Sequence, residues 1–260
     1  MKKLLEMLGG RFIGFVRYAG GAAILFGQTL FWLAASPSRR RHVFEQMNFI
    51  GVNSLPITFL ISLFTGMVLA LQSAYQMQKI SAEMYIASLV SLSMTRELGP
   101  VLTALIVAGR VGASITAEIG SMKVTEQIDA LETLATNPVK YLVVPRFLAL
   151  IVMLPLLTIY SDIVGMIGGY IIGVFKLNIS HDMYVKMTYD PLKFKDVFTG
   201  LIKSFFFAAI VCIVACYEGM KTEGGAEGVG KATTSSVVTS FILIIACDCF
   251  FTALFYFVWK

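Results

Sequence analysis

Long apolar segments separated by short polar intervals are the dominant pattern of this chain. A helix crosses a hydrocarbon core with about 20 apolar residues. Five segments are long enough, at about residues 54–74, 86–119, 147–175, 197–217 and 237–258. We therefore predict an all-α integral membrane protein with five transmembrane helices.

A shorter apolar stretch, residues 19–35, precedes these segments and is flanked by basic residues. The basic residues are Lys2, Lys3, Arg11 and Arg17 before it and Arg39, Arg40 and Arg41 after it. If the stretch crossed the membrane, one of the two groups would lie outside, against the positive-inside tendency. A cleaved signal peptide is the alternative, because Ala34 and Ala35 resemble a cleavage site. We favour an interfacial helix in an N-terminal region, residues 1–47, followed by the membrane domain, residues 48–260.

Composition supports a membrane protein, since 57% of residues are hydrophobic and 14% are charged, against roughly 25% charged in soluble domains. The net charge of +5 could suggest nucleic acid, but cytoplasmic Lys and Arg facing anionic lipid explain it better. With the N-terminus inside, cytoplasmic segments hold twice as many Lys and Arg as outer ones, with Lys203 counted at the outer boundary. This bias predicts a cytoplasmic N-terminus and a C-terminus on the outer side of the membrane, which is the periplasmic side if the membrane is the inner one of a Gram-negative bacterium.

Arg96 and Glu97 are adjacent charges inside the second apolar segment. Charge within a membrane is costly unless it is paired or hydrated, so the pair is a candidate functional site. Pro100 follows and has no N–H to donate to the carbonyl of Arg96. The alternative is that the pair lies among the outer headgroups, because the 34-residue segment is about 51 Å long.

Asp162 and Asp248 also lie inside predicted spans. Each could be a proton-relay acid of a secondary transporter, or a protonated acid bonded to a neighbouring helix. Neither has a His or a second carboxylate close by in the sequence, which favours the second interpretation.

Metal and enzyme chemistry are not expected. Four cysteines lie in apolar runs without zinc-site spacing: Cys212, Cys216, Cys247 and Cys249. His42 and His181 are remote from them and from each other, so no catalytic triad can be assembled. Residues 225–233 nearly match a phosphate-binding loop, but Ala232 follows Lys231 where a hydroxyl is required. We interpret them as a flexible cytoplasmic connection.

Small residues recur at four-residue spacing in two spans, a pattern that allows helices to approach closely. They are Gly165, Gly169 and Gly173 in the third span, and Gly109, Ala113 and Ala117 in the second. Such faces pack helices within one chain or between two, so they permit a homodimer without requiring one.

Val124–Pro138 is a short charged segment between two spans. We predict a helix of about 11 residues with Thr125 as its N-cap and Asn137-Pro138 as its end, too short to cross the membrane. Its apolar and acidic residues lie on different faces: Ile128, Leu131 and Leu134 on one, and Glu126, Asp129 and Glu132 on the other. The residues alone leave two interpretations open, an amphipathic linker on the membrane surface or an insert for a cytoplasmic partner.

Four segments resemble the MlaE/YrbE family, and the likeness extends over nearly the whole chain from about Asn48. They are GMVLALQ (66–72), RELGPVLTALIVAGRVGASITAEIGSMKVTEQIDALE (96–132), NPVKYLVVPR (137–146) and KATTSSVV (231–238). Members of this family are permease subunits of ABC transporters that move phospholipid between the two membranes of Gram-negative bacteria.

The resemblance implies an inner-membrane homodimer that serves outer-membrane lipid asymmetry and has no catalysis of its own. It implies a cytoplasmic ABC ATPase (MlaF-like) that binds ATP and Mg²⁺, so no cofactor is expected on this chain. A STAS-domain protein (MlaB-like) and a periplasmic MCE-domain protein (MlaD-like) are the other implied partners, and no nucleic acid is expected.

The resemblance also assigns site residues. Residues matching the coupling helix that inserts into the ATPase are Glu126, Gln127, Asp129, Ala130 and Leu131. Residues matching positions near the lipid cavity are Leu69, Gln72, Arg96, Glu97 and Leu98. Asp162, Asp248 and the interval 176–196 do not match family hallmarks. Two rival functions are a proton-coupled secondary transporter using Asp162, Asp248 and Glu97, and a structural membrane anchor.

Overall fold

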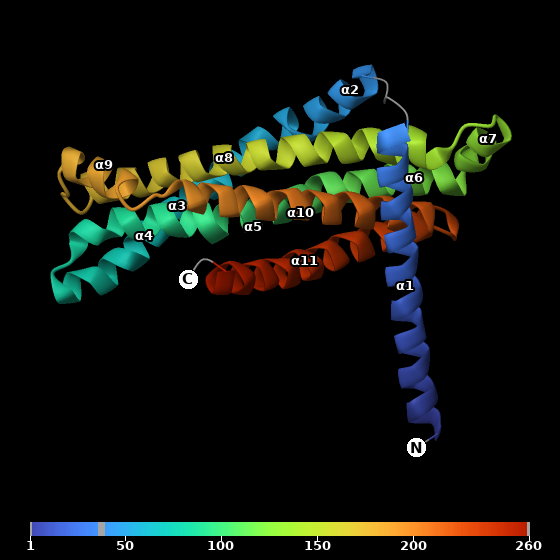
Figure 1. Ribbon diagram of the computed structural model, residues 1–260, viewed down its shortest axis with the longest axis horizontal. Helices are drawn as coiled ribbons and strands as arrows, with labels where there is room; N and C mark the ends of the chain where they lie inside the picture. Colours follow the sequence, from blue (N-terminus) through green and yellow to red (C-terminus); the bar gives the residue numbers. More distant parts are fainter. Residues whose placement is uncertain (1, 36–39, 259–260) are drawn as a thin grey trace.

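The protein is a bundle of long helices that lie side by side, with one helix crossing it (Figure 1). The computed structural model describes residues 2–35 and 40–258, and the side chains of all of these except residues 2–12, 15, 80 and 258. Every regular element in this part of the chain is helical, which confirms the predicted all-α class.

The α-helices are α1 (Lys2–Ala35), α2 (Arg40–Ile50), α3 (Leu55–Met77), α4 (Ile86–Ser93), α5 (Gly99–Val107), α6 (Ala113–Val124), α7 (Gln127–Thr133), α8 (Val144–Phe175), α9 (His181–Tyr189), α10 (Phe194–Met220) and α11 (Gly225–Val258). Short turns of 3₁₀-helix are η1 (Val52–Ser54), η2 (Gln78–Ile80) and η3 (Glu83–Tyr85). Three π-helical turns are η4 (Met94–Leu98), η5 (Ala108–Gly112) and η6 (Val139–Val143).

All five predicted spans lie within helical segments, and within the described residues 6 segments are long and apolar enough to cross a membrane. The additional one, Val16–Ala35, belongs to α1. The second span runs without a break from α4 to α6 through η4 and η5. The chain is therefore a multi-pass membrane protein.

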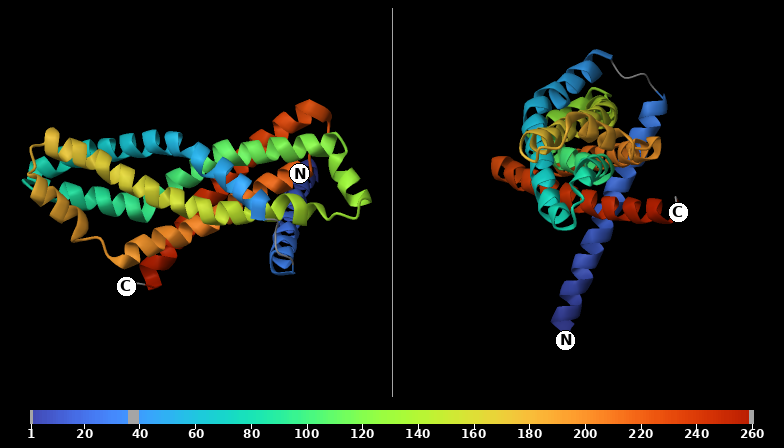
Figure 2. Two further views of the ribbon diagram at one scale, coloured as in Figure 1. Left: turned by 90° about the horizontal axis from the view of Figure 1, so that it is seen from above. Right: turned by 90° about the vertical axis from the view of Figure 1, so that its left-hand side faces the viewer.

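The helix α1 crosses the long helices and meets them near the end where α7 lies (Figures 1 and 2). Gly21 packs against the ring of Tyr217 on α10, and the ammonium of Lys140 lies 5.4 Å from the ring centroid of Trp32. Residues Val16–Ala35 of α1 are long and apolar enough to cross a membrane, so the interfacial position of α1 stays a prediction. Arg39 and the side chains of Lys2, Lys3 and Arg11 lie outside the described residues.

The prediction of a flexible connection at residues 225–233 is wrong, because α11 already begins at Gly225. The turn after α10 is confined to residues 221–224, and Gly224 and Gly225 have φ values of 86° and 68° that glycine adopts readily. Glu227 and Lys231 form an ion pair of 2.7 Å one turn apart on the new helix. Alanine, glutamate and lysine favour helix strongly enough to offset the glycines between them.

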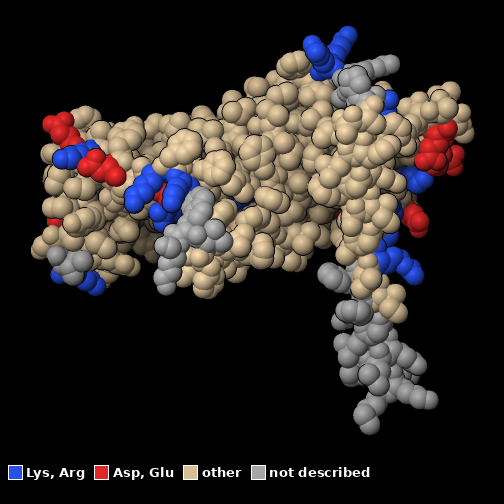
Figure 3. Space-filling view, viewed as in Figure 1, with Lys and Arg blue, Asp and Glu red and all other residues tan. Residues whose placement is uncertain are grey.

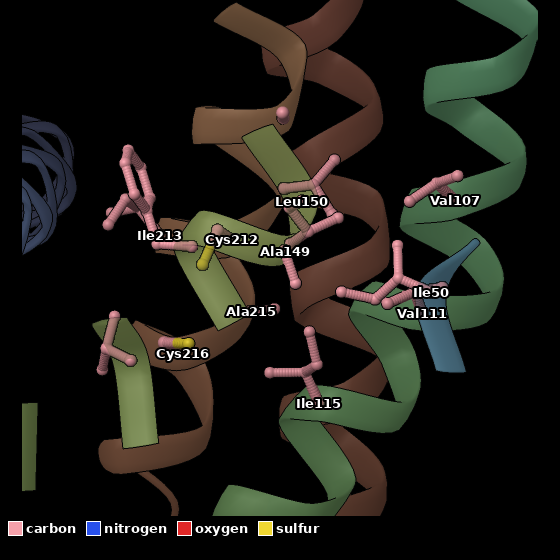
Figure 4. Packing of buried hydrophobic residues seen from close by; sticks show 14 of the residues in the cluster. Ile50, Val107, Val111, Ile115, Ala149, Leu150, Cys212, Ile213, Ala215 and Cys216 are labelled. Carbon is pink, nitrogen blue, oxygen red and sulfur yellow. The ribbon is translucent and has the colours of Figure 1, made fainter. Parts of the chain in front are cut away.

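The core lies where α5, α6, α8 and α10 meet (Figure 4). Cys212 and Cys216 are buried in it, as apolar residues would be, whereas Cys247 is half-buried and Cys249 is exposed. At the periphery, α11 buries 17% of its most apolar stretch, against 67% for the corresponding stretch of α8. The face of α11 that points away from the bundle is thus available to lipid or protein.

The predicted glycine face of α8 is used within the chain. α3 and α8 form the most extensive helix pair, and a methyl group on Gly66 would collide with the backbone of Gly165. Tyr184 of α9 fills the space beside Gly169 and Gly173. Burial there raises the pKa of the Tyr184 phenol.

Candidate functional site

Lys203 of α10 is a completely buried cation at the junction of three helical segments. Its ammonium lies 2.7 Å from Oε2 of Glu97 on η4 and 2.9 Å from Oδ1 of Asp248 on α11. It also donates a hydrogen bond of 2.8 Å to the hydroxyl of Thr252. A buried cation is tolerated when it is paired with acids and its hydrogens have acceptors, and both conditions are met here.

The backbone beside Glu97 contributes to the same site. The ammonium of Lys203 donates to the carbonyl of Arg96 at 3.2 Å. In a regular helix this carbonyl would accept a hydrogen bond from the N–H of residue 100, but Pro100 has no N–H. The chain forms a π-helical turn here, with the Gly99 N–H bonded to the carbonyl of Met94. Such turns are frequent at functional sites.

Arg96 pairs with a different acid. Its guanidinium lies 2.7 Å and 2.8 Å, through two nitrogens, from Oδ1 of Asp196 at the start of α10. The other oxygen of Asp196 accepts from the backbone N–H of Lys193 at 3.0 Å, which caps α10. The Asp196 side chain is 7% exposed and that of Arg96 is 50% exposed. The guanidinium is therefore anchored on one side and open on the other.

The open side of Arg96 borders a pocket of about 690 Å³. Its charged lining comprises Arg96, Glu97, Lys193, Lys195 and Asp196, and Phe255 and Tyr256 of α11 supply aromatic surface. On the face shown in Figure 3, charges gather near the two ends and in a few separate groups, and most of the surface between is formed by other residues. The pocket thus combines cations with aromatic rings in a largely apolar molecule.

Two of the five predicted cavity residues, Arg96 and Glu97, line this pocket. Leu69 and Leu98 pack instead against a small apolar cluster formed by α3, α4 and η4. Gln72 is exposed on the surface of α3. The structure brings the charged part of the predicted set to the pocket and places the rest on neighbouring surfaces.

Sequence reasoning missed Lys203 and Asp196. Lys203 was expected at the outer boundary, but it is buried, because two acids and a hydroxyl from other helices surround it. Its position within the apolar run 197–217 was the available signal. Asp196 lies at the end of a polar interval, and its partner Arg96 is far away in the sequence, so no local pattern could reveal it.

Arg110 is a further charged residue within the second span, and it joins that span to the residues around the α2–α3 connection. Its guanidinium donates to the carbonyl of Phe49 at 2.6 Å and to the hydroxyl of Ser54 at 2.8 Å. It also lies 5.2 Å from the ring centroid of Phe49. Arg110 thus ties η5 to the segment that joins α2 and α3.

The three acids considered for proton relay are arranged differently from one another. Glu97 and Asp248 share Lys203. Asp162 is 8% exposed and packs against Gly99, and its Oδ1 has no hydrogen-bond partner in the described part of the chain. Two of the acids therefore share one lysine as their ion-pair partner, and the third lies apart from them.

The charged segment is a separate short helix, α7, and its ends differ from the prediction. Thr125 is not the N-cap, because its hydroxyl donates to the carbonyl of Ser121 at 2.7 Å and Glu126 takes the capping position with φ 58°. The helix ends at Thr133, earlier than expected. Asn137 lies just before the next helical turn, η6, and its side-chain oxygen accepts from the N–H of Val139 at 3.0 Å.

The apolar residues of α7 do not all face inward. Ile128 is buried and Leu131 is half-buried against the core, but Leu134 is 74% exposed because it lies just beyond the last helical residue. Of the predicted coupling residues, four are exposed and Leu131 is half-buried; the exposed ones are Glu126, Gln127, Asp129 and Ala130. Asp129 is also paired with Lys123 of α6 at 2.8 Å.

A bundle of membrane-crossing helices with a paired-charge site between them defines a multi-pass membrane protein of the transport class. Within that class, the chain belongs to the MlaE permease family, since the family described as Permease MlaE matches residues 43–254. The predicted family resemblance is confirmed.

Curated relatives cover nearly the whole chain. A probable ABC transporter permease protein of Rickettsia typhi is 45% identical over 97% of this chain and 98% of its own length. A similarly named protein of Synechocystis is 43% identical over 90% and 89% of the two chains. The intermembrane phospholipid transport system permease protein MlaE of Haemophilus influenzae is 37% identical over 97% of each.

Proposed function

We propose that this chain is the transmembrane permease subunit of an ABC transporter that moves phospholipid between the inner and outer membranes of a Gram-negative bacterium. The observation that carries the proposal is the end-to-end similarity to the Haemophilus influenzae permease, whose name states intermembrane phospholipid transport. In this proposal the chain works as a homodimer in the inner membrane and helps to maintain outer-membrane lipid asymmetry. A separate ATPase binds and hydrolyses ATP with Mg²⁺, so the permease has no catalysis of its own.

The pocket beside Arg96 suits one end of a phospholipid. The half-exposed guanidinium of Arg96 and the neighbouring Lys193 can attract a phosphate. Phe255 and Tyr256 on the same lining can contact the glycerol and the first methylenes. The fixed pairs Arg96–Asp196 and Lys203–Glu97 hold the charged groups in place, which reduces the cost of ordering them when a lipid binds.

The helix α7 suits the cytoplasmic partner. It lies at the end of the bundle near α1 (Figure 1), where the predicted topology places the cytoplasm. Its exposed residues Gln127 and Ala130 and the exposed Leu134 offer polar and apolar contacts together. A short helix with this surface fits a groove on an ATPase. A STAS-domain protein below and an MCE-domain protein on the periplasmic side complete the proposed assembly.

The pairing of Glu97 and Asp248 with Lys203 favours this function over proton-coupled transport. A relay acid must be free to pass its proton to another group, whereas Glu97 and Asp248 are both held against one ammonium by ion pairs of 2.7 Å and 2.9 Å. Asp162 remains as a single buried acid, and one carboxyl group without a partner does not make a relay.

Purification of the tagged permease from its native membrane tests the proposal. We expect an ATPase and phospholipid to co-purify with the wild-type chain and to be detected by mass spectrometry. Arg96→Ala and Glu97→Ala should retain the ATPase but carry less lipid, because both residues line the pocket and neither belongs to α7. Wild-type protein without bound ATPase would contradict the proposal, and unchanged lipid in both variants would remove Arg96 and Glu97 from the site.

A further inference from the structure

The two helices that flank α7 are joined directly at its base. Glu118 lies on α6, before α7, and Arg146 lies on α8, after it. A guanidinium nitrogen of Arg146 is 2.8 Å from Oε2 of Glu118. The Arg146 side chain is 4% exposed and that of Glu118 is 55% exposed. The pair therefore runs from the interior to the surface at the end of the bundle that carries α7.

Each member of the pair belongs to a firmly held helix. Arg146 also donates to the carbonyl of Leu142 in η6 at 2.8 Å. On α6, the hydroxyl of Thr116 lies 3.1 Å from the carbonyl of Ala215 on α10 and 2.8 Å from the hydroxyl of Ser236 on α11. Gly219 of α10 packs against Ile119 of α6. The helix α6 is thus fixed to α10 and α11, and the Glu118–Arg146 ion pair joins it to α8.

The chain segments that connect α7 to α6 before it and to α8 after it are short and conformationally restricted. Glu126 and Ala135 lie at either end of α7 with φ values of 58° and 55°. This left-handed region is unfavourable for a residue with a Cβ and persists when surrounding contacts hold it. The ion pair from Asp129 to Lys123 at 2.8 Å fixes α7 to α6. A displacement of α7 would therefore be transmitted to both α6 and α8, because flexible linkers do not separate them from α7.

The helix α8 leads from this base to the pocket. It packs along α3 and contacts α5 and η4, and its Asp162 rests against Gly99, two residues beyond Glu97 in the sequence. A displacement of α8 would consequently press on the turn that carries Arg96 and Glu97.

We propose that the Glu118–Arg146 pair is the link that transmits displacement of α7 into α8 and from there to the pocket. The proposal rests on the proposed coupling role of α7. Both residues are positioning residues, because they lie away from the pocket and act through the helices they join. Without the pair, α7 would still bind its ATPase, but its displacement would reach α8 only through the chain after α7 and not through a direct contact between α6 and α8.

Glu118→Gln is the discriminating variant, since it removes the charge from the more exposed partner and leaves Arg146 in place. Glu227→Gln is the matched control, because it breaks an exposed ion pair of 2.7 Å with Lys231 on α11. Both are purified as the complete complex with the co-purifying ATPase and placed in lipid vesicles. Lipid transfer and ATP hydrolysis are measured together, and hydrogen exchange is recorded with and without a non-hydrolysable ATP analogue.

We expect Glu118→Gln to retain the ATPase and to move roughly five-fold less lipid per ATP hydrolysed. This factor is at the lower end of the range over which one site typically changes the affinity of another. The nucleotide analogue should change exchange in α7 and the first turns of α8 in the wild type and in Glu227→Gln. In Glu118→Gln the change in the first turns of α8 should be smaller than in the wild type, and the change in α7 and α6 should remain.

Wild-type transfer per ATP in Glu118→Gln, together with an unchanged response of α8, would overturn the proposal. Loss of the bound ATPase in this variant would also overturn it, because the pair would then serve assembly. Failure of the proposed function has a different signature, since the wild-type complex itself would show no bound ATPase or no nucleotide response in α7.

Discussion

The ammonium of Lys203 lies 2.7 Å from a carboxylate oxygen of Glu97, although Lys203 itself is completely buried. This contact joins α10 to η4, and the neighbouring contact with Asp248 adds α11. Three parts of the sequence thus meet at one cation beside the pocket. We expect the network both to stabilise the bundle and to fix the position of Glu97.

Replacing Lys203 tests this dual role. Lys203→Met leaves Glu97 and Asp248 close together without a counter-charge, so we expect a loss of about 3–5 kcal/mol of stability, as for other broken buried pairs. Thermal unfolding in detergent measures the effect, with Lys231→Met as the control because the Lys231 side chain is 76% exposed. The triple variant with Glu97→Gln and Asp248→Asn should recover part of the loss. Equal stability of Lys203→Met and the control would show that the network is not a structural element.

The exposed end of α7 yields a second prediction. Leu134→Asp places a charge on an exposed apolar side chain, so it should reduce the amount of co-purified ATPase and leave the unfolding temperature nearly unchanged. Leu134→Met, which keeps the apolar contact, is the matched control. If Leu134→Asp binds the ATPase as well as the control does, the contact surface of α7 lies elsewhere.

The predicted coupling residues can be separated by the same assay. Asp129→Lys replaces the partner of Lys123 with a like charge, so it should weaken ATPase binding and also loosen α7 from α6. Ala130→Glu changes an exposed residue outside that pair, so it should affect ATPase binding alone. Hydrogen exchange of α7 in the isolated permease distinguishes the two effects. Wild-type ATPase binding and ATP hydrolysis in both variants would argue against coupling through this helix.

The contact between α3 and α8 gives a stability prediction. A methyl group on Gly168 would collide with the backbone carbonyl of Leu63, which cannot move without separating the helices. We expect Gly168→Ala to destabilise the protein by about 1–3 kcal/mol, as over-packing does. Gly230→Ala is the control, since nothing lies within 4 Å of the added carbon, and it should be neutral or stabilising. The reverse order of unfolding temperatures would show that the helices tolerate a wider spacing.

Features encoded locally were predictable from the sequence. The spans follow from apolar length, and the altered backbone near Arg96 follows from Pro100, whose missing N–H leaves a carbonyl that Lys203 now occupies. The interfacial position of α1 stays a prediction from the basic residues around it, because charges on both flanks disfavour crossing.

Features that depend on distant partners were not predictable. The depth of Lys203 depends on Glu97 and Asp248, which come from other helices. Similarly, Asp196 looks like one of many charges in a polar interval until Arg96 is placed beside it. Leu134 fits the apolar face of an 11-residue helix, but the helix ends at Thr133 and Ala135 turns the chain into the left-handed region. In each case a contact between segments overrides the local pattern.

The most direct test of the account is the energy source of lipid movement. The complex of the permease with its co-purified ATPase is placed in vesicles that contain a labelled phospholipid, and its transfer to an acceptor is measured with ATP or with an imposed pH gradient. We predict that transfer requires ATP hydrolysis and is unaffected by the gradient. Transfer driven by the pH gradient without ATP would contradict the account and would indicate a secondary transporter.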